Sequence, residues 1–411
     1  MSLREDAEKI ISSAIAAAKP DAAVASAVKL AGFPSGKLVL IAIGKAAWQM
    51  ARTACLELPG RISHGVVSTK YGHSEGELPG IQIFEAGHPV PDENSVLATK
   101  AAMEAVKNLS SDDAVLFLIS GGGSSLFECP LVPLEELKSL TQQLLSKGAD
   151  IVEINTIRKR ISAVKGGRFA KLCEPAQVFS IVLSDIIGDP LDMIASGPAY
   201  PDSSTSSQAL AIAKKYKLKA NDETMSLFRK ETPKKLENVT AAITGSVSQL
   251  CNAASLKCVE LGYDPFILTA SLTCSARDAG SFLSAIARHH AKSAKSLAFI
   301  AGGETVVEIK GKGLGGRNQE LALSAAAGIS GLDGVCIFSV GSDGTDGPTD
   351  AAGGFVDGGA MERLKEKGID LFSYLADNNS YEALGAIDGL IKTGPTGTNV
   401  NDLSVVLVNR R

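Results

Sequence analysis

The sequence predicts an α/β fold: two α/β domains with largely parallel sheets and an interdomain cleft. Apolar runs of strand length alternate with helix-length periodic stretches along almost the whole chain. These runs are uniformly apolar, as expected where helices cover both faces of a parallel sheet. The length of 411 residues favours two or three domains over one.

The expected elements follow from these patterns in chain order. An amphipathic helix occupies the first 20 residues, and later periodic stretches predict helices over 46–57, 93–109 and 134–146. Apolar runs predict strands over 37–43, 65–69, 81–84, 114–119, 178–183, 240–244, 265–268, 297–300, 305–309, 335–340 and 403–408. A polar, lysine-rich stretch over 214–237 interrupts the alternation, which places the domain boundary between 1–236 and 237–411.

Composition excludes several classes of protein. The 41 Lys plus Arg residues and 45 Asp plus Glu residues leave a net charge of −4, so a nucleic-acid partner is not expected. The seven cysteines form no CxxC pair, which favours a reducing, cytoplasmic location. The five histidines show no zinc-ligand spacing. No apolar stretch reaches the roughly 18 residues of a membrane span, and oligomeric state is left open.

A glycine-rich junction follows one of the expected strands. Gly121, Gly122 and Gly123, with Ser124 and Ser125, come directly after the strand over 114–119. Exposed backbone N–H groups and hydroxyls of this kind suit a phosphate, while the alternative is a flexible turn.

A lysine follows the first strand. Lys45 lies at a strand-to-helix junction, where a positive charge opposes the helix dipole. This placement favours a bound anion, and a surface lysine in a tight turn is the alternative. No GxxxxGK[ST] motif occurs in the chain.

A dense run of cations lies at 158–168. It contains Arg158, Lys159, Arg160, Lys165 and Arg168, with Gly166-Gly167 forming a candidate anion-binding turn. The cations of 158–160 cannot share one helix face. A functional cation and a charged surface helix are equally weighted interpretations.

Carboxylates follow two other expected strands, at Asp185 and in the segment containing Asp343, Asp346 and Asp350. A carboxylate directly after a buried strand is suited to holding Mg²⁺ or accepting a proton. The spacing does not match an EF-hand, and ordinary turns are the alternative.

The segment 311–320 formally satisfies GxGxxG and opens a helix at Arg317. A dinucleotide site also needs an acid about 20 residues further on, at the end of the next strand. Here the first such acid is Asp343, about 30 residues beyond Gly313, so the match to NAD is weak. The loop still suits phosphates, and Arg317 adds a fixed guanidinium.

These segments together resemble the glycerate 2-kinase family, the class II glycerate kinases whose C-terminal part is called the MOFRL domain. The resemblance spans nearly the whole chain in order. It is carried by the segments 44–48, 70–76, 86–92, 118–125, 165–168, 184–185, 195–198, 315–320, 341–350 and 395–402. It implies ATP-dependent phosphorylation of D-glycerate to 2-phosphoglycerate in a cleft between two α/β domains.

Phosphoryl transfer needs groups that neutralise a triphosphate, orient a hydroxyl and hold Mg²⁺. We expect Lys45 and Arg317 to stabilise the transferring group or bind the substrate carboxylate. Asp185 and Asp343 are expected to hold Mg²⁺ or accept the hydroxyl proton, with the two roles not assigned between them, and Asp346 is a further metal candidate. The expected nucleotide contacts are Gly121, Gly122, Gly123, Ser124, Ser125, Gly315 and Asn318.

Two other functions compete with this hypothesis. An NAD(P)H-dependent hydroxypyruvate reductase would act on a three-carbon acid of the same kind and use the GxGxxG loop. A non-catalytic sugar-phosphate sensor would not need several carboxylates at strand ends. The kinase ranks first, the reductase second and the sensor third.

Overall fold

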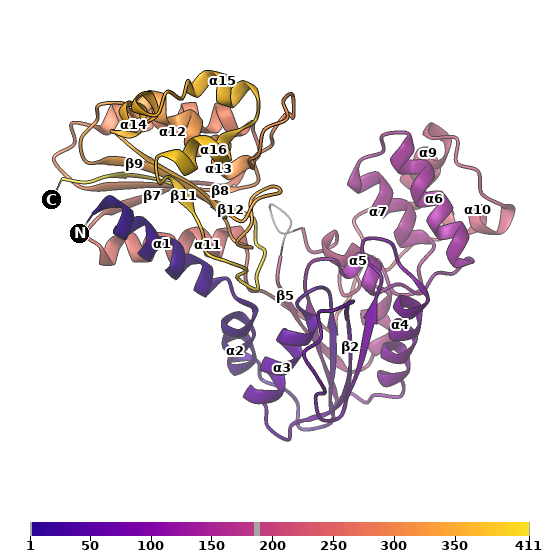
Figure 1. Ribbon diagram of the computed structural model, residues 1–411. Helices are drawn as coiled ribbons and strands as arrows, with labels where there is room; N and C mark the ends of the chain where they lie inside the picture. Colours follow the sequence, from indigo (N-terminus) through magenta and orange to yellow (C-terminus); the bar gives the residue numbers. More distant parts are fainter. Residues whose placement is uncertain (1, 185–189, 411) are drawn as a thin grey trace. The chain divides into compact units, whose positions relative to one another are not determined.

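The computed structural model describes residues 2–184 and 190–410 (Figure 1). The chain forms two compact units: a central unit, Ala23–Thr244, and a terminal unit, Met1–Ala22 with Gly245–Arg411. The expected boundary after residue 236 is therefore corrected in two ways. The strand after the lysine-rich stretch pairs within the sheet of the central unit, and the N-terminal helix belongs with the C-terminal half.

The sheet of the central unit is wholly parallel, with the strand order β3-β2-β1-β4-β5-β6. Its strands are β1 (Leu38–Ile43), β2 (Ile62–Lys70), β3 (Ile81–Ala86), β4 (Ala114–Ile119), β5 (Gln177–Val182) and β6 (Val239–Ile243). β1 and β4 are buried at every position, because both lie in the middle of the sheet with helices on either side. The predicted α/β class and these strands are confirmed.

The helices of the central unit form two groups. One group flanks the sheet and consists of α3 (Ala47–Glu57), α4 (Glu93–Ala105), α5 (Gly123–Leu126), α8 (Arg168–Cys173) and the 3₁₀ turn η1 (Ile194–Ser196). The other has its own apolar core and consists of α6 (Leu134–Ser146), α7 (Ile151–Arg160), α9 (Ser206–Lys215) and α10 (Asp222–Phe228). In Figure 1 this second group stands apart from the strands of its unit. The lysine-rich stretch is thus part of a helical cluster rather than an interdomain linker.

The sheet of the terminal unit is mixed, with the order β11-β10-β9-β12-β8-β7. Its strands are β7 (Asp264–Leu272), β8 (Leu297–Gly303), β9 (Val335–Gly341), β10 (Gly353–Asp357), β11 (Leu390–Ile391) and β12 (Asp402–Val408). Only β7 and β8 pair in parallel. The last strand, β12, inserts between β8 and β9 and is antiparallel to both, and β10 is antiparallel to β9 and β11. The expected parallel arrangement therefore holds for the first sheet and not for most of the second.

Helices cover both faces of the second sheet, α1 and α11 on one face and α12 and α13 on the other (Figure 1). The helices of the unit are α1 (Leu3–Ala17), α11 (Val247–Glu260), α12 (Ala276–His290), α13 (Arg317–Ile329), α14 (Ala360–Glu366), α15 (Leu371–Ala376) and α16 (Ser380–Ala386), and α2 (Pro20–Leu30) spans the boundary. The strand expected over 305–309 does not form beyond one isolated bridge at Val306. The short β10 and β11 were not expected.

Within the described residues, no helix combines the length and apolar character needed to cross a membrane. All seven cysteines are free thiols. Cys173, Cys251, Cys258 and Cys336 are buried as expected of small core residues, whereas Cys274 is exposed.

Candidate functional site

The central sheet has one topological switch point, between β1 and β4. From β1 the chain continues through β2 and β3 toward one edge, and from β4 it continues through β5 and β6 toward the other. Ligands of open α/β sheets bind outside the carboxyl ends of the strands at such a point, because the flanking loops diverge there. The two loops at this point begin at Gly44 and Ser120, and they carry Lys45 and the three glycines.

Hydrogen bonds join these two loops into one surface. The N–H of Lys45 donates to the carbonyl of Gly121 at 2.9 Å, and the N–H of Ala46 donates to Oγ of Ser120 at 3.1 Å. Gly44 has φ +110°, and a Cβ there would lie 2.3 Å from Oγ of Ser120. Glycine is required at this position by both its backbone conformation and its contact.

Lys45 itself is exposed at this surface. Its ammonium has no hydrogen-bond or ion-pair partner among residues 2–184 and 190–410, while its carbonyl accepts from His73 and Thr69. The backbone is therefore fixed and the charged end is available. The anion-binding interpretation fits this arrangement better than the surface-lysine alternative.

The glycine run after β4 is held closely rather than flexible. Gly122 has φ +86°, and a Cβ there would lie 2.9 Å from Cδ2 of His88 and 3.3 Å from Cγ of Lys45. A Cβ at Gly123 would lie 2.7 Å from Cβ of Ala195. The N–H groups of Gly121 and Gly122 donate to no acceptor in the described parts of the chain, so they are free to bind a phosphate oxygen.

The two serines of this loop differ. Oγ of Ser125 donates to the carbonyl of Gly122 at 3.2 Å, so this buried hydroxyl stabilises the turn itself. Oγ of Ser124 lies 3.0 Å from Oγ of Ser196, which in turn donates to Oδ1 of Asn155 at 2.9 Å. Ser124 is the serine that remains half-exposed at the loop surface.

A buried lysine, Lys165, stabilises the glycine loop through hydrogen bonds to its backbone. Nζ of Lys165 donates to the carbonyls of Ser124 and Phe127 at 2.8 and 3.0 Å, and it lies 3.5 Å from the carboxylate of Glu128. Burial lowers the pKa of Lys165 to about 8, against the opposing attraction of Glu128. Lys165 is therefore structural, and the anion-binding turn expected at Gly166-Gly167 is not supported.

The neighbouring cations Lys159 and Arg160 are also structural. Their side chains are 1% and 0% exposed, so neither the functional interpretation nor the charged surface helix describes them. Nζ of Lys159 lies 3.0 Å from Oδ1 of Asp202, and Nη2 of Arg160 lies 3.7 Å from its Oδ2. A buried carboxylate far along the chain neutralises them, which the local sequence does not reveal.

The expected catalytic or metal-binding residue Asp185 lies outside the described residues. Its strand, β5, pairs with β4 on one side and β6 on the other.

A second group of predicted residues lies in the terminal unit. Because β12 runs antiparallel to β8 and β9, its first residue, Asp402, pairs with Gly303 and Gly341 at their ends. Nε and Nη2 of Arg317 donate to the two carboxylate oxygens of Asp402 at 2.5 and 3.0 Å. Nη1 of Arg317 lies 3.0 Å from Glu304.

This pairing stabilises the charged form of Arg317. Although burial opposes its charge, the hydrogen bonds and charge of Asp402 raise the pKa of Arg317 above its ordinary value. All three guanidinium nitrogens face carboxylates. Sequence reasoning identified Arg317 and missed Glu304 and the pairing role of Asp402.

Asp346 caps the start of α13. Its Oδ1 accepts from the backbone and side-chain nitrogens of Asn318 at 3.2 and 3.3 Å, and its Oδ2 accepts from the N–H of Gln319 at 2.8 Å. Burial raises the pKa of Asp346 to about 6, although these N–H groups oppose the shift. Its carboxylate therefore completes a helix terminus.

Asn318, expected to contact a nucleotide, is 1% exposed. Its Oδ1 accepts from Oγ of Ser339 at 2.6 Å, and its Nδ2 donates to Asp346. Asn318 is thus a buried link between α13 and β9.

The glycine-rich loop over 310–316 is fixed by another part of the same unit. The N–H groups of residues 310, 311, 312, 313 and 314 all donate to Asp377, Asn378 or Asn379. A Cβ at Gly315 would lie 2.2 Å from Oγ of Ser380. The glycines permit this close packing, so the expected phosphate role of the loop is not supported.

Gly313→Ala tests this assignment. A Cβ at Gly313 would lie 2.3 Å from Cβ of Asn379, so we expect the substitution to destabilise the protein by about 1–3 kcal/mol. Urea unfolding measures the loss, and steady-state kinetics on the folded variant should give an unchanged KM for nucleotide. Gly32→Ala, in open space and without a positive φ, is the control and should leave stability almost unchanged. A nucleotide KM raised tenfold in Gly313→Ala, with no loss of stability, would contradict the packing role.

Asp343 remains available at the end of β9. Its Oδ1 accepts from the N–H of Thr345 at 3.0 Å, and its half-buried carboxylate has no cationic partner among the described residues. The parts of the chain that the structure describes contain no group of three or more His, Cys, Asp or Glu side chains arranged to hold a metal. Any ion at Asp343 would therefore be held by fewer than three such side chains of the described residues.

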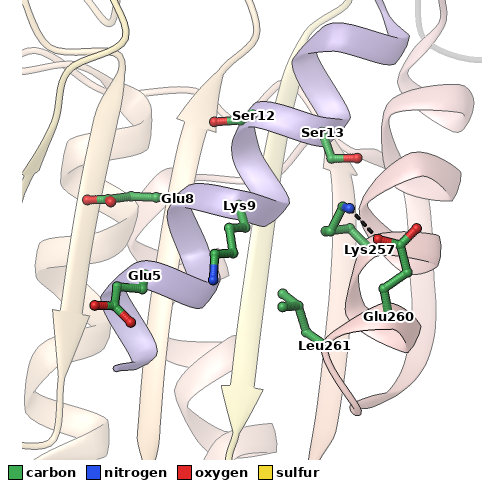
Figure 2. Close-up of a pocket in the computed structure, with 8 residues that line it drawn as sticks. All are labelled: Glu5, Glu8, Lys9, Ser12, Ser13, Lys257, Glu260 and Leu261. Carbon is green, nitrogen blue, oxygen red and sulfur yellow. Dashed lines mark hydrogen bonds and ion pairs between the residues drawn. The ribbon is translucent and has the colours of Figure 1, made fainter. Parts of the chain in front are cut away.

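A separate pocket of about 660 Å³ opens between α1 and α11 in the terminal unit (Figure 2). It is lined by Glu5, Glu8, Lys9, Ser12, Ser13, Lys257, Glu260 and Leu261. The ion pair between Lys257 and Glu260 crosses its rim. None of the predicted site residues lines this pocket.

Comparison with known proteins places these features in context. Residues 6–229 match the model of a domain of unknown function, DUF4147, and residues 297–402 match that of the MOFRL family. The chain is 50% identical to a D-glycerate 2-kinase of Thermotoga maritima, over 99% of each chain. It is 42% identical to a glycerate 2-kinase of Pyrococcus horikoshii, over 100% of this chain and 98% of the relative.

Solved structures agree with these relatives. A crystal structure of a glycerate kinase from Thermotoga maritima superimposes with a TM-score of 0.94 at 50% identity, covering 99% of both chains. A relative in Agrobacterium vitis, 36% identical over 99% of this chain and 95% of its own, has a name that refers to a hydroxypyruvate reductase.

Proposed function

The chain belongs to the glycerate 2-kinase family, and we propose that it transfers the γ-phosphoryl group of ATP to the 2-hydroxyl of D-glycerate, with Mg²⁺, to give 2-phosphoglycerate. The observation that carries the proposal is Lys45. Its ammonium, unpartnered among the described residues, lies at the switch point of a parallel sheet, beside a glycine loop with two N–H groups that are free in the same parts of the chain. Such a surface neutralises and orients an oxyanion, as phosphoryl transfer requires.

The two units have opposite local charge. The carboxyl ends of β1 and β2 carry Lys45 and Lys70, while Arg317 in the terminal unit is paired with Glu304 and Asp402. We assign the phosphate oxygens to the basic surface and the divalent cation to the acidic one.

A magnesium ion fits Asp343. A carboxylate oxygen is the ligand that Mg²⁺ prefers, and protein sites commonly supply one or two carboxylates while substrate phosphates and water complete the octahedron. Asp343 and Asp185 are the two candidates: one holds the ion and the other accepts the proton of the substrate hydroxyl. The ion, when bound, neutralises charge that develops on the phosphates.

The residues of the chain account for the remaining tasks. The N–H groups of Gly121 and Gly122 bind phosphate oxygens, and the ammonium of Lys45 stabilises the negative charge of the transferring group. Arg317 keeps Asp402 and Glu304 neutralised, so that the carboxylate of Asp343 remains available at the end of β9. Asp346 holds the helix that carries Arg317.

A pocket of about 420 Å³ in the central unit suits the nucleoside. Its apolar lining residues are Pro89, Val90, Pro91, Leu137 and Leu145, and its polar ones are Glu135, Lys138, Ser139, Thr141, Gln142 and Arg158. Nη2 of Arg158 donates to the carbonyl of Ser124 at 2.7 Å, so one lining residue also contacts the glycine loop. Apolar walls with a few polar groups are typical of sites for a nucleobase.

The proposal is tested by ADP formation in a coupled assay with purified protein, ATP and MgCl₂. We expect turnover only when D-glycerate is present, little or none with L-glycerate, and a fall to background after EDTA that excess MgCl₂ reverses. ADP formation independent of glycerate, or full activity in EDTA, would contradict it. A cytoplasmic location is part of the same proposal.

The reductase hypothesis needs a dinucleotide loop. The N–H groups of the 310–314 loop are already occupied by residues 377–379, which argues against pyrophosphate binding there. NADH or NADPH mixed with hydroxypyruvate and the protein should therefore show no nicotinamide oxidation. A sensor, by contrast, would bind three-carbon acids without consuming ATP.

A further inference from the structure

His88 lies against the glycine loop without a function assigned to it. Its ring carbon Cδ2 and nitrogen Nε2 would lie 2.9 and 3.1 Å from a Cβ at Gly122, on which the stem of Lys45 also packs. The ring is half-buried and has no hydrogen-bond partner among residues 2–184 and 190–410. A partly buried imidazole with an unused nitrogen beside free N–H groups is a candidate ligand-binding group.

The titratable groups that face His88 are two lysines and a histidine. Lys45 approaches from the turn after β1, and Lys70 and His73 approach from the end of β2 and the segment that follows it. Burial first, and then these three groups, lower the pKa of His88.

The nearest carboxylates are engaged elsewhere. Glu85 on β3 accepts from the N–H and Oγ of Ser74 at 3.0 and 2.7 Å. Asp92 accepts from the hydroxyl of Tyr71 at 2.8 Å and caps α4 through the N–H of Ser95 at 2.9 Å. Within the described residues, the four basic side chains thus converge without a carboxylate bound to them.

We propose that His88 is a substrate-binding residue whose imidazole contacts an oxyanion of the substrate and gains a proton as that oxyanion binds. The oxyanion is a phosphate oxygen of the nucleotide or the carboxylate of glycerate, since both present the same chemistry to an imidazolium. This inference rests on the proposed function for the identity of the ligands. It adds to that function a further substrate-binding residue and the uptake of a proton on binding.

The sign of the coupling follows from the neighbouring charges. In the free protein, burial first and then the charges of Lys45 and Lys70 lower the pKa of His88, so the ring is neutral at neutral pH. A bound oxyanion offsets those cations and favours the protonated ring, so the pKa of His88 rises on binding. Between the pKa values of His88 in the free and the bound protein, binding of the oxyanion is accompanied by uptake of a proton. In that interval the affinity therefore weakens as pH rises, by up to about tenfold per pH unit.

Isothermal titration calorimetry of the full chain measures this uptake. Mg²⁺ with the non-hydrolysable analogue AMP-PNP is titrated at pH 7.5 in two buffers of different ionisation enthalpy, Hepes and Tris. D-Glycerate is titrated separately into the free protein and into protein saturated with the analogue. We expect uptake approaching about one proton for one of these probes in the wild type, none in His88→Gln or His88→Asn, and unchanged uptake in His289→Gln, an exposed histidine on α12.

The outcomes separate the two sources of the oxyanion. Uptake with Mg²⁺·AMP-PNP assigns His88 to phosphate, and uptake with D-glycerate assigns it to the carboxylate. Absence of proton uptake in the wild type, or equal uptake in the His88 variants, overturns the proposal. A protein that takes up the proton with AMP-PNP yet fails the coupled assay would refute the kinase and retain the oxyanion site.

Discussion

Lys45→Ala should lower kcat with D-glycerate and MgATP by about 10²–10³-fold, equivalent to about 2.7–4 kcal/mol of lost transition-state stabilisation. The ammonium has no partner in the described residues, so its removal leaves no unpaired protein charge behind. The fold should therefore be unaffected, and the loss should appear in kcat more than in KM for glycerate. Steady-state kinetics together with thermal unfolding measure both effects.

Lys107→Ala is the matched control, because Lys107 is an exposed lysine of the same unit whose one ionic partner in the described parts of the chain is Glu104. Its kinetics should equal those of the wild type. Activity of Lys45→Ala within a few-fold of the wild type would remove Lys45 from the mechanism.

Asp202→Ala should cost about 3–5 kcal/mol of stability, the largest single loss that we expect. The carboxylate of Asp202 is fully buried, and it accepts from Nζ of Lys159 at 3.0 Å and from Oγ1 of Thr232 at 2.6 Å. Its removal leaves Lys159 and Arg160 buried without their shared counter-charge. Urea unfolding, compared with Glu223→Ala at an exposed position on α10, measures the loss.

The same carboxylate gives a dependence on pH. Burial opposes its charge, but the hydrogen bond from Thr232 and the charge of Lys159 outweigh burial and lower the pKa of Asp202. Its contribution is present above the ordinary pKa of an aspartate, near about 4, and is lost as pH falls further. Asp202→Asn should remove that part of the acid sensitivity. An Asp202→Ala variant as stable as the wild type would show that the other partners of the two cations, Asp192 and Glu231, are sufficient.

The sequence was sufficient for the fold class and for the central sheet, because those strands are buried on both faces and read as continuous apolar runs. It failed for the direction of the pairs in the second sheet. β12 is as apolar as a parallel strand. It nevertheless inserts between β8 and β9 and pairs antiparallel with both. Apolar periodicity carries no information about strand direction.

The candidate site was predicted in part. Lys45 and the loop after β4 could be proposed because their position at strand ends is visible in the sequence, and their role stays a prediction. The glycines of 311–316 led to a wrong expectation of phosphate binding. A glycine that allows close packing against another backbone segment cannot be distinguished in the sequence from one that allows close approach of a phosphate. The buried cations at 159, 160 and 165 misled for a related reason: their partners, Asp202 and Glu128, are identified only by the fold.

The position of the transferred phosphoryl group tests the central claim most directly. ³¹P and ¹H NMR of the product from D-glycerate and MgATP distinguish a phosphate ester at carbon 2 from one at carbon 3. The account predicts 2-phosphoglycerate, formed in equal amount with ADP. A 3-phosphate ester, or ADP released with free phosphate and unaltered glycerate, would contradict it.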